Sequence, residues 1–201
     1  MTHLQQLSPH PLVVHGHNVF SQDHRDWSML LNHFDHVSIL NLGLYYMPVI
    51  GYGQFLMKEM TKFPNITILK LEVLACGHSF GASSFHLLRM SSGIRELKLK
   101  LLDMPRGLEG QIACRSGCRC VEPSNWETKE LVLRCLEEIE IDGFIGTEHE
   151  LALVRRLFKW TTMLKRMTVH FNDSVTQSKG KELCQLLLSF STPEICMKFL
   201  H

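Results

Sequence analysis

The chain has 201 residues, of which 45% are hydrophobic and 20% are charged, and this composition allows one sizeable buried core. Its 21 basic and 20 acidic residues leave a net charge of +1 and form no long run of either sign, which excludes a general attraction to nucleic acid or to membrane surfaces. No apolar stretch has the length of a membrane span or a signal-peptide core, and the seven cysteines are an odd number, so we expect a soluble protein of the cytoplasm or nucleus.

In chain order, residues 1–33 show no apolar period and are predicted to form an irregular lead-in or a degenerate repeat. A strand pattern then recurs five times. In FPNITILKLEV, residues 63–73, Leu69, Leu71 and Val73 alternate as in a strand with one buried face, and Ile66 lies three residues before them. The same frame predicts adjacent parallel strands at residues 38–44, 67–73, 95–101, 137–142 and 165–171.

The spacing of these strands indicates a repeat. The second apolar position of each unit falls at Leu40, Leu69, Leu97, Ile139 and Met167, so the intervals are 29, 28, 42 and 28 residues. Three of the four are at the upper end of the period of leucine-rich repeats. The long interval exceeds its neighbours by 42 minus 28, or 14 residues, which predicts an excursion at residues 103–126. We expect the third and fourth strands to stay neighbours and Trp126 to pack back onto the core.

The segments between the strands favour helices. Thr147 and Glu150 fit a capping box, followed by an apolar face from Leu151 to Phe158, and a second helix is predicted at residues 183–190. Shorter helices are indicated at residues 55–60 and 85–88. The predicted fold is therefore an α/β leucine-rich-repeat solenoid, with a parallel sheet and helices on its convex side.

One position departs from the usual leucine-rich repeat, whose ninth residue is Asn or Cys. In this chain that position holds Tyr45, Leu74, Leu102, Phe144 and Asn172. Only the last can join an asparagine ladder. We expect the other turns to be stabilised differently and the solenoid to be irregular.

Residues 114–171 resemble the FBD domain of plant F-box/leucine-rich-repeat proteins. The likeness lies in Cys118 and Cys120 ahead of Pro123 and Trp126, the strand LEEIEIDGF, the motif GTEHE at residues 146–150, and the strand LKRMTV after a helix. Residues 63–101 resemble the repeats that precede that domain in grass members. The chain then divides into a lead-in at 1–33, leucine-rich repeats at 34–113 and an FBD-like domain at 114–201 that continues the solenoid.

The resemblance implies a function in protein recognition. In that family the F-box binds the Skp adaptor of a cullin-type ubiquitin ligase, and the repeats select protein substrates. Nothing in residues 1–40 resembles an F-box, so we expect Skp binding only from a longer form that contains one. An orphan fragment without a ligase link is an alternative.

No catalytic motif occurs in the sequence. His149-Glu150 begins like H-E-x-x-H, but Leu153 stands where the second histidine would bind zinc. We therefore expect no enzyme activity and no cofactor. The alternative from another class is a zinc-dependent structural or regulatory protein, because Cys114, Cys118 and Cys120 offer three thiolates. A fourth ligand would have to come from Cys135, Cys76 or a histidine.

The candidate binding residues alternate with the core leucines and should project from the open face of the sheet. They are Lys70, Lys98, Lys100, Glu140, Asp142 and His170. Two interpretations stay open. Lys98/Glu140 and Lys100/Asp142 could simply pair across strands, or the basic and acidic residues could together orient a protein partner.

Overall fold

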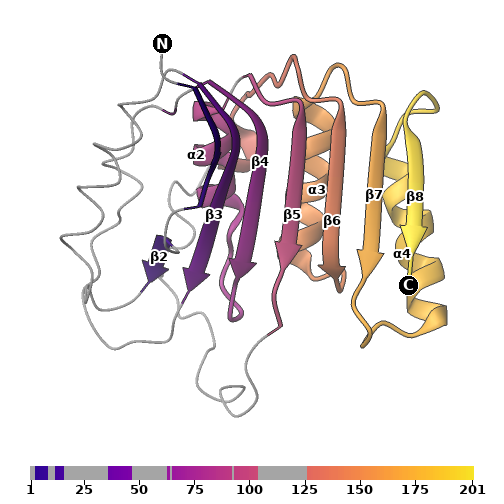
Figure 1. Ribbon diagram of the computed structural model, residues 1–201. Helices are drawn as coiled ribbons and strands as arrows, with labels where there is room; N and C mark the ends of the chain where they lie inside the picture. The colour runs from indigo at the N-terminus through magenta and orange to yellow at the C-terminus, as the bar shows by residue number, and fades with distance from the viewer. Residues whose placement is uncertain are drawn as a thin grey trace.

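The protein is an α/β structure built on one parallel sheet, as seen in a computed structural model that describes residues 3–8, 12–15, 36–46, 63, 65–91, 93–103 and 126–201 (Figure 1). Within these ranges the sheet has eight strands, and seven of them follow the order β1-β3-β4-β5-β6-β7-β8. Every pair of neighbouring strands is parallel. The predicted α/β class with a parallel sheet is confirmed.

The five predicted strands form the middle of this sheet in chain order. They are β3 (His36–Tyr46), β4 (Asn65–Leu74), β5 (Glu96–Leu101), β6 (Glu138–Phe144) and β7 (Arg166–Phe171). The second apolar positions of the repeat lie side by side, as Leu40↔Leu69↔Leu97↔Ile139↔Met167. Equivalent positions of the sequence repeat are thus paired with one another across the sheet. This register places every anchor on one face, where all five are buried.

Three further strands were not predicted. β1 (His3–Leu7) pairs with the first half of β3, and β2 (Leu12–His15) pairs with its second half. The prediction of an irregular lead-in at residues 1–33 is therefore wrong for these two segments. β8 (Cys196–Leu200) pairs with β7. These strands have four or five residues, too few to show a clear period, and they are strands because a neighbour supplies their hydrogen bonds.

Three helices are described, and all lie on the same face of the sheet (Figure 1). They are α2 (Gly81–Met90), α3 (Glu148–Trp160) and α4 (Gln177–Phe190). The core lies between this helical layer and the sheet, where Leu87, Leu157 and Leu187, one from each helix, are fully buried. The helix indicated at residues 55–60 lies outside the described residues.

The predicted capping box at the start of α3 is confirmed. The Thr147 side chain accepts a hydrogen bond from the Glu150 N–H at 3.3 Å, and Glu150 Oε2 accepts one from the Thr147 N–H at 3.3 Å. Glu150 Oε2 also accepts hydrogen bonds from the N–H groups of Ile145 and Gly146 at 3.0 and 2.7 Å. One buried carboxyl thus satisfies three backbone donors in the turn that links β6 to α3.

The β5–β6 connection returns to the core at Trp126, as predicted. β5 and β6 are direct neighbours, despite the extra length between them. Trp126 opens the short 3-10 helix η3 (Trp126–Thr128) and is buried against Trp160, with ring centroids 6.1 Å apart. It lies so close to Gly81 that a Cβ there would be 2.1 Å from its Cζ2 atom. The absence of a side chain at Gly81 therefore makes room for the indole. The predicted excursion RGLEGQIACRSGC lies outside the described residues.

Apolar residues pack against one another at the ends of the first strands. Leu74 and Cys76 form a second, small cluster of buried residues, against which Tyr45 and Leu102 pack. Burial raises the pKa of the Cys76 thiol. In the fifth repeat the ninth residue is Asn172. Its side chain accepts a hydrogen bond from the Ser174 N–H and donates one to Asp103, both at 2.9 Å. The first three turns are therefore stabilised by packing, and the last one by an amide.

We expect the stability contribution of Glu150 to depend on pH. Burial raises the pKa of this carboxyl above its usual value, against the opposing effect of the three backbone N–H donors. Below about pH 4.5, its ordinary pKa, the group is neutral in both folded and unfolded chains. As pH rises through the raised folded-state pKa, the wild type should therefore lose stability relative to Glu150→Gln, which cannot ionise.

Urea unfolding of both proteins from pH 4 to pH 8 measures this difference. Glu148→Gln removes a charge from the same helical turn without removing a buried carboxyl, and it is the matched control. The raised pKa of Glu150 would be contradicted if the difference in unfolding free energy between wild type and Glu150→Gln stays constant with pH, or if it shifts in favour of the wild type as pH rises.

Candidate functional site

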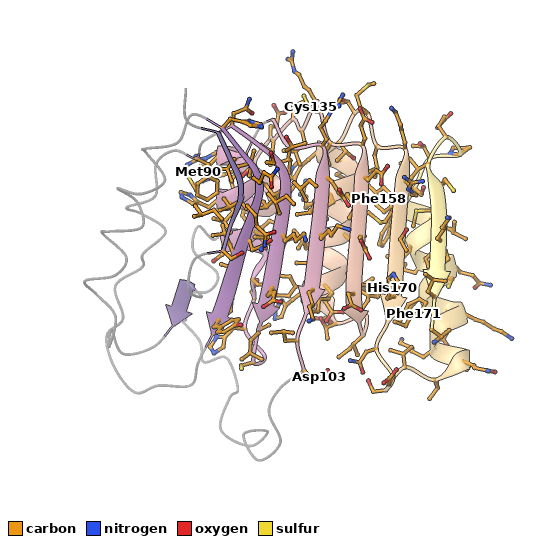
Figure 2. All side chains as sticks on the ribbon, in the orientation of Figure 1. Met90, Asp103, Cys135, Phe158, His170 and Phe171 are labelled. Carbon is orange, nitrogen blue, oxygen red and sulfur yellow. The ribbon has the colours of Figure 1, made fainter. Side chains whose placement is uncertain are left out.

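The candidate site is the face of the sheet that carries no described helix, referred to here as the open face. Its side chains alternate along each strand with the core residues, as His170 and Phe171 do on β7 (Figure 2). Parallel sheets are normally covered on both faces, and their strands then read as continuous apolar runs. These strands instead alternate apolar and polar residues, which suits a sheet with one solvated face.

All six predicted site residues lie on this face, on four consecutive strands. One row across the sheet is Asn41↔Lys70↔Lys98↔Glu140↔Thr168↔Lys198, and the next is Gly43↔Glu72↔Lys100↔Asp142. His170 follows on β7, level with Leu200. Residues that are up to 100 positions apart in the sequence are thereby placed side by side.

Lys98 makes two ion pairs, one with Glu140 in the first row and one with Glu96 on its own strand. Its Nζ lies 2.8 Å from Glu140 Oε2 and 3.0 Å from Glu96 Oε1. The hydrogen bond to Glu140 is the main cause of a raised pKa for Lys98, and the same bond lowers the pKa of Glu140. The expected cross-strand pair Lys98/Glu140 is confirmed. Because both side chains are over a third exposed, water screens the pair and its contribution to stability is small.

The second row differs from the expected pairing. Lys100 and Asp142 are Cα partners, but the Lys100 Nζ lies 3.9 Å from Glu72 Oε1, on the other neighbouring strand. Among the described residues, neither Asp142 nor Lys70 has an ion pair. His170 Nε2 lies 3.7 Å from Glu140 Oε1. Lys70 in the first row and Asp142 in the second therefore keep charges that a partner could use.

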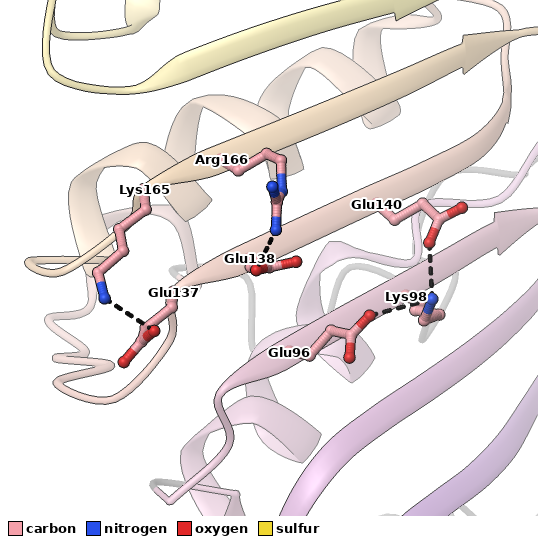
Figure 3. A network of polar contacts seen from close by, with 7 residues as sticks. All are labelled: Glu96, Lys98, Glu137, Glu138, Glu140, Lys165 and Arg166. Carbon is pink, nitrogen blue, oxygen red and sulfur yellow. Dashed lines mark hydrogen bonds and ion pairs between the residues drawn. The ribbon is translucent and has the colours of Figure 1, made fainter.

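A further group of ion pairs, formed by residues outside the six predicted site residues, lies nearer the starts of the strands (Figure 3). Glu137 lies between two cations, 2.9 Å from Lys165 Nζ and 3.5 Å from an Arg95 Nη. The hydrogen bond from Lys165 is the main cause of a lowered pKa for Glu137. Glu138 pairs with Arg166. A signal for this group exists in the sequence, because each charged pair directly precedes the second anchor of its repeat: RE, EE and KR.

Taken by strand, the charges of the open face form stripes. β5 and the residue before it contribute three cations, Arg95, Lys98 and Lys100, and one carboxylate, Glu96. Lys165, Arg166 and His170 lie on β7 or next to it. Between them, Glu137, Glu138, Glu140 and Asp142 form an acidic stripe along β6. Such a surface can recognise a partner of complementary charge pattern.

A metal centre gains no support from the part of the chain that the structure describes, in which no group of three or more Cys, His, Asp or Glu side chains is placed to hold an ion. Cys114, Cys118 and Cys120 lie outside that part, so the zinc alternative stays a sequence-based prediction. None of the described helices is long and apolar enough to cross a membrane.

Comparisons of the chain with protein-family models, with curated proteins and with solved structures find no significant match.

Proposed function

We propose that this protein is a non-enzymatic protein-interaction module in which the open face of the sheet binds a protein partner. The observation that carries the proposal is the striped charge pattern on a parallel sheet whose described helices all cover the opposite face. A charged face built from consecutive strands presents many contact residues in fixed rows. Such a surface selects partners by charge complementarity.

The architecture in this proposal is a leucine-rich-repeat solenoid ending in an FBD-like unit. Two features support it: the strands follow chain order, and the same repeat position lies in one row from β3 to β7. In a solenoid each repeat contacts only its neighbours, so an insertion leaves the stacking intact. The direct pairing of β5 with β6 across the 42-residue interval agrees with this property.

The biological setting in the proposal is substrate recognition for a cullin-type ubiquitin ligase, as the likeness to F-box/FBD proteins implies. The partners would be protein substrates, and the Skp adaptor would be engaged only through an F-box. The acidic and basic stripes of the open face would select the substrate. No nucleic acid or membrane takes part.

A charge-swap experiment tests the proposal. In Lys98→Glu the pair with Glu140 becomes repulsive, and in the double variant Lys98→Glu/Glu140→Lys the pair is restored with opposite orientation. The double variant restores only the contact with residue 140, because the residue at position 98 then repels Glu96. If the pair serves only the fold, the double variant should regain most of the stability lost in Lys98→Glu and capture the partner as the wild type does. If the open face binds a partner, the double variant should regain thermal stability but still lose at least about fivefold in capture of that partner.

The measurement is quantitative affinity capture from plant extract with mass spectrometry, beside thermal unfolding of the same preparations. Fusing an F-box ahead of Met1 tests the ligase setting, because a captured substrate should then be ubiquitinated with the wild-type face and not with the swapped one. Lys181→Glu, an exposed charge reversal on α4, is the matched control. Equal capture by wild type and double variant would refute binding through this face.

A further inference from the structure

The outer edge of β8 offers unpaired backbone groups. β8 pairs with β7 on its inner side, where the Cys196 N–H donates to the Lys165 carbonyl at 2.8 Å. In a parallel sheet, alternate residues direct their N–H and C=O groups to the same neighbour. The backbone groups of Cys196, Lys198 and Leu200 therefore point to β7, and those of Met197 and Phe199 point outward. In the described part of the chain, no strand pairs with that outer edge (Figure 1).

At this edge the core-facing side chains of β8 are only partly covered. Met197 and Phe199 continue the rows of Met167 and Val169, which are both fully buried, but they are themselves only half-buried. The Phe199 ring stacks on Phe171, with centroids 6.2 Å apart. On α4, which lies behind the β8 end of the sheet (Figure 1), the Leu188 side chain is 50% exposed.

The open face of β8 carries one charge, Lys198, which lies opposite Thr168 of β7. Lys198 is exposed and has no ion pair among the described residues. Elsewhere on this face, Lys98 and Arg166 meet Glu140 and Glu138 on the adjacent strand, whereas Lys70 has no ion pair. Lys198 is thus an unpaired cation at the edge, where an acidic side chain on an added strand would lie opposite it.

We propose that the outer edge of β8 binds an extended peptide segment of a partner protein, which adds a strand to the sheet. The segment carries apolar side chains at alternate positions, which cover Met197 and Phe199, and an Asp or Glu on the other face, opposite Lys198. Backbone hydrogen bonds to Met197 and Phe199 bind the strand, and the apolar and acidic positions select its sequence. This site is separate from the charged stripes and does not depend on a ligase role.

Charge distinguishes this occupant from a second copy of the chain. An antiparallel pairing of two β8 strands centred on Lys198 would match Met197 with Phe199 of the other copy, but it would place two ammonium groups opposite each other. Like charges opposite each other destabilise a sheet pair. The edge therefore suits a heterologous acidic strand better than its own copy.

The test uses synthetic peptides of about nine residues in which Val alternates with Thr, a pattern that favours strands. One peptide has Glu at its central polar position, a second has Lys there, and a third is the Glu peptide with N-methyl groups on the edge that would bond to β8. Binding to the full chain is followed by backbone amide exchange. We expect the Glu peptide to slow exchange at the Met197 and Phe199 amides, and to leave the amides already bonded to β7 unchanged.

Protein variants sharpen the result. Lys198→Glu should lower the affinity for the Glu peptide by about threefold to tenfold, because a cross-strand attraction becomes a repulsion. The same substitution should raise the affinity for the Lys peptide, because a repulsion becomes an attraction. Lys181→Glu, on the surface of α4, should change neither affinity. The N-methylated peptide should not bind.

Three results would overturn the proposal. The first is no protection of the Met197 and Phe199 amides by the Glu peptide, in which case Lys198 serves to keep the edge solitary. The second is that the N-methylated peptide binds with the same affinity as the Glu peptide. The third is concentration-dependent self-association in analytical ultracentrifugation that the Glu peptide does not compete, which would assign the edge to a second copy.

Discussion

Replacing Leu97 by Ala should lower the free energy of unfolding by about 2–5 kcal/mol, as measured by urea denaturation, because it leaves a cavity in the core. Leu97 is 2% exposed and lies in the anchor row, between Leu69 and Ile139. Its side chain meets anchors from both neighbouring strands, so the cavity should weaken two strand contacts at once.

Lys100→Ala on the same strand is the matched control. Its side chain projects from the open face, and its ion pair with Glu72, at 3.9 Å, is exposed. We expect a change of about 0–1 kcal/mol, the usual range for an exposed pair. Equal effects of the two substitutions would mean that the anchors do not face the core.

Gly143→Ala should lower the free energy of unfolding by about 2–4 kcal/mol, because it combines a left-handed backbone with a close contact. Gly143 has φ +77°, and a Cβ there would lie 2.3 Å from the Leu101 carbonyl oxygen. That oxygen belongs to the backbone of the adjacent strand and cannot move without disturbing the sheet. The loss should appear in urea unfolding with an unchanged m-value.

Gly93→Ala is the control for Gly143→Ala. A Cβ at Gly93 would meet the Oδ1 atom of Asn65 at 2.7 Å, but Asn65 is exposed and its side chain can rotate away. We expect an effect below about 1 kcal/mol, as for other surface substitutions. A larger loss at Gly93 than at Gly143 would contradict the role assigned to Gly143, which lies at an irregularity in the pairing of β6 with β7.

That irregularity also decides the position of Phe144. The pairing of β6 with β7 shifts between Ile141 and Phe144, so two residues separate these pairs on β6 and one separates their partners on β7. Phe144, which simple alternation would place on the open face, is thereby buried in the core, 6.2 Å from the Phe171 ring. Gly143 marks the place in the sequence, but its effect on Phe144 depends on the neighbouring strand.

The sequence by itself determined the central five strands, their parallel order and the start of α3. Each depends on information within about ten residues or on a repeated spacing: the anchors recur in one frame, and Thr147 and Glu150 are three positions apart in the capping box. All six candidate site residues could be assigned to one face for the same reason, since alternation along a strand is a local property.

Only the tertiary structure decided the features that depend on a neighbour distant in the chain. The backbones of β3 and β7 supply the hydrogen bonds that make β1, β2 and β8 strands. Lys100 has a carboxylate beside it on each adjacent strand, Glu72 and Asp142, and it pairs with Glu72. Trp126 fits against Gly81 although 45 positions separate them in the chain. A segment of four or five residues is too short to form a strand without a neighbour. Packing and solvation decide which of two neighbouring carboxylates an exposed lysine contacts. Both outcomes are therefore determined only when the sheet has formed.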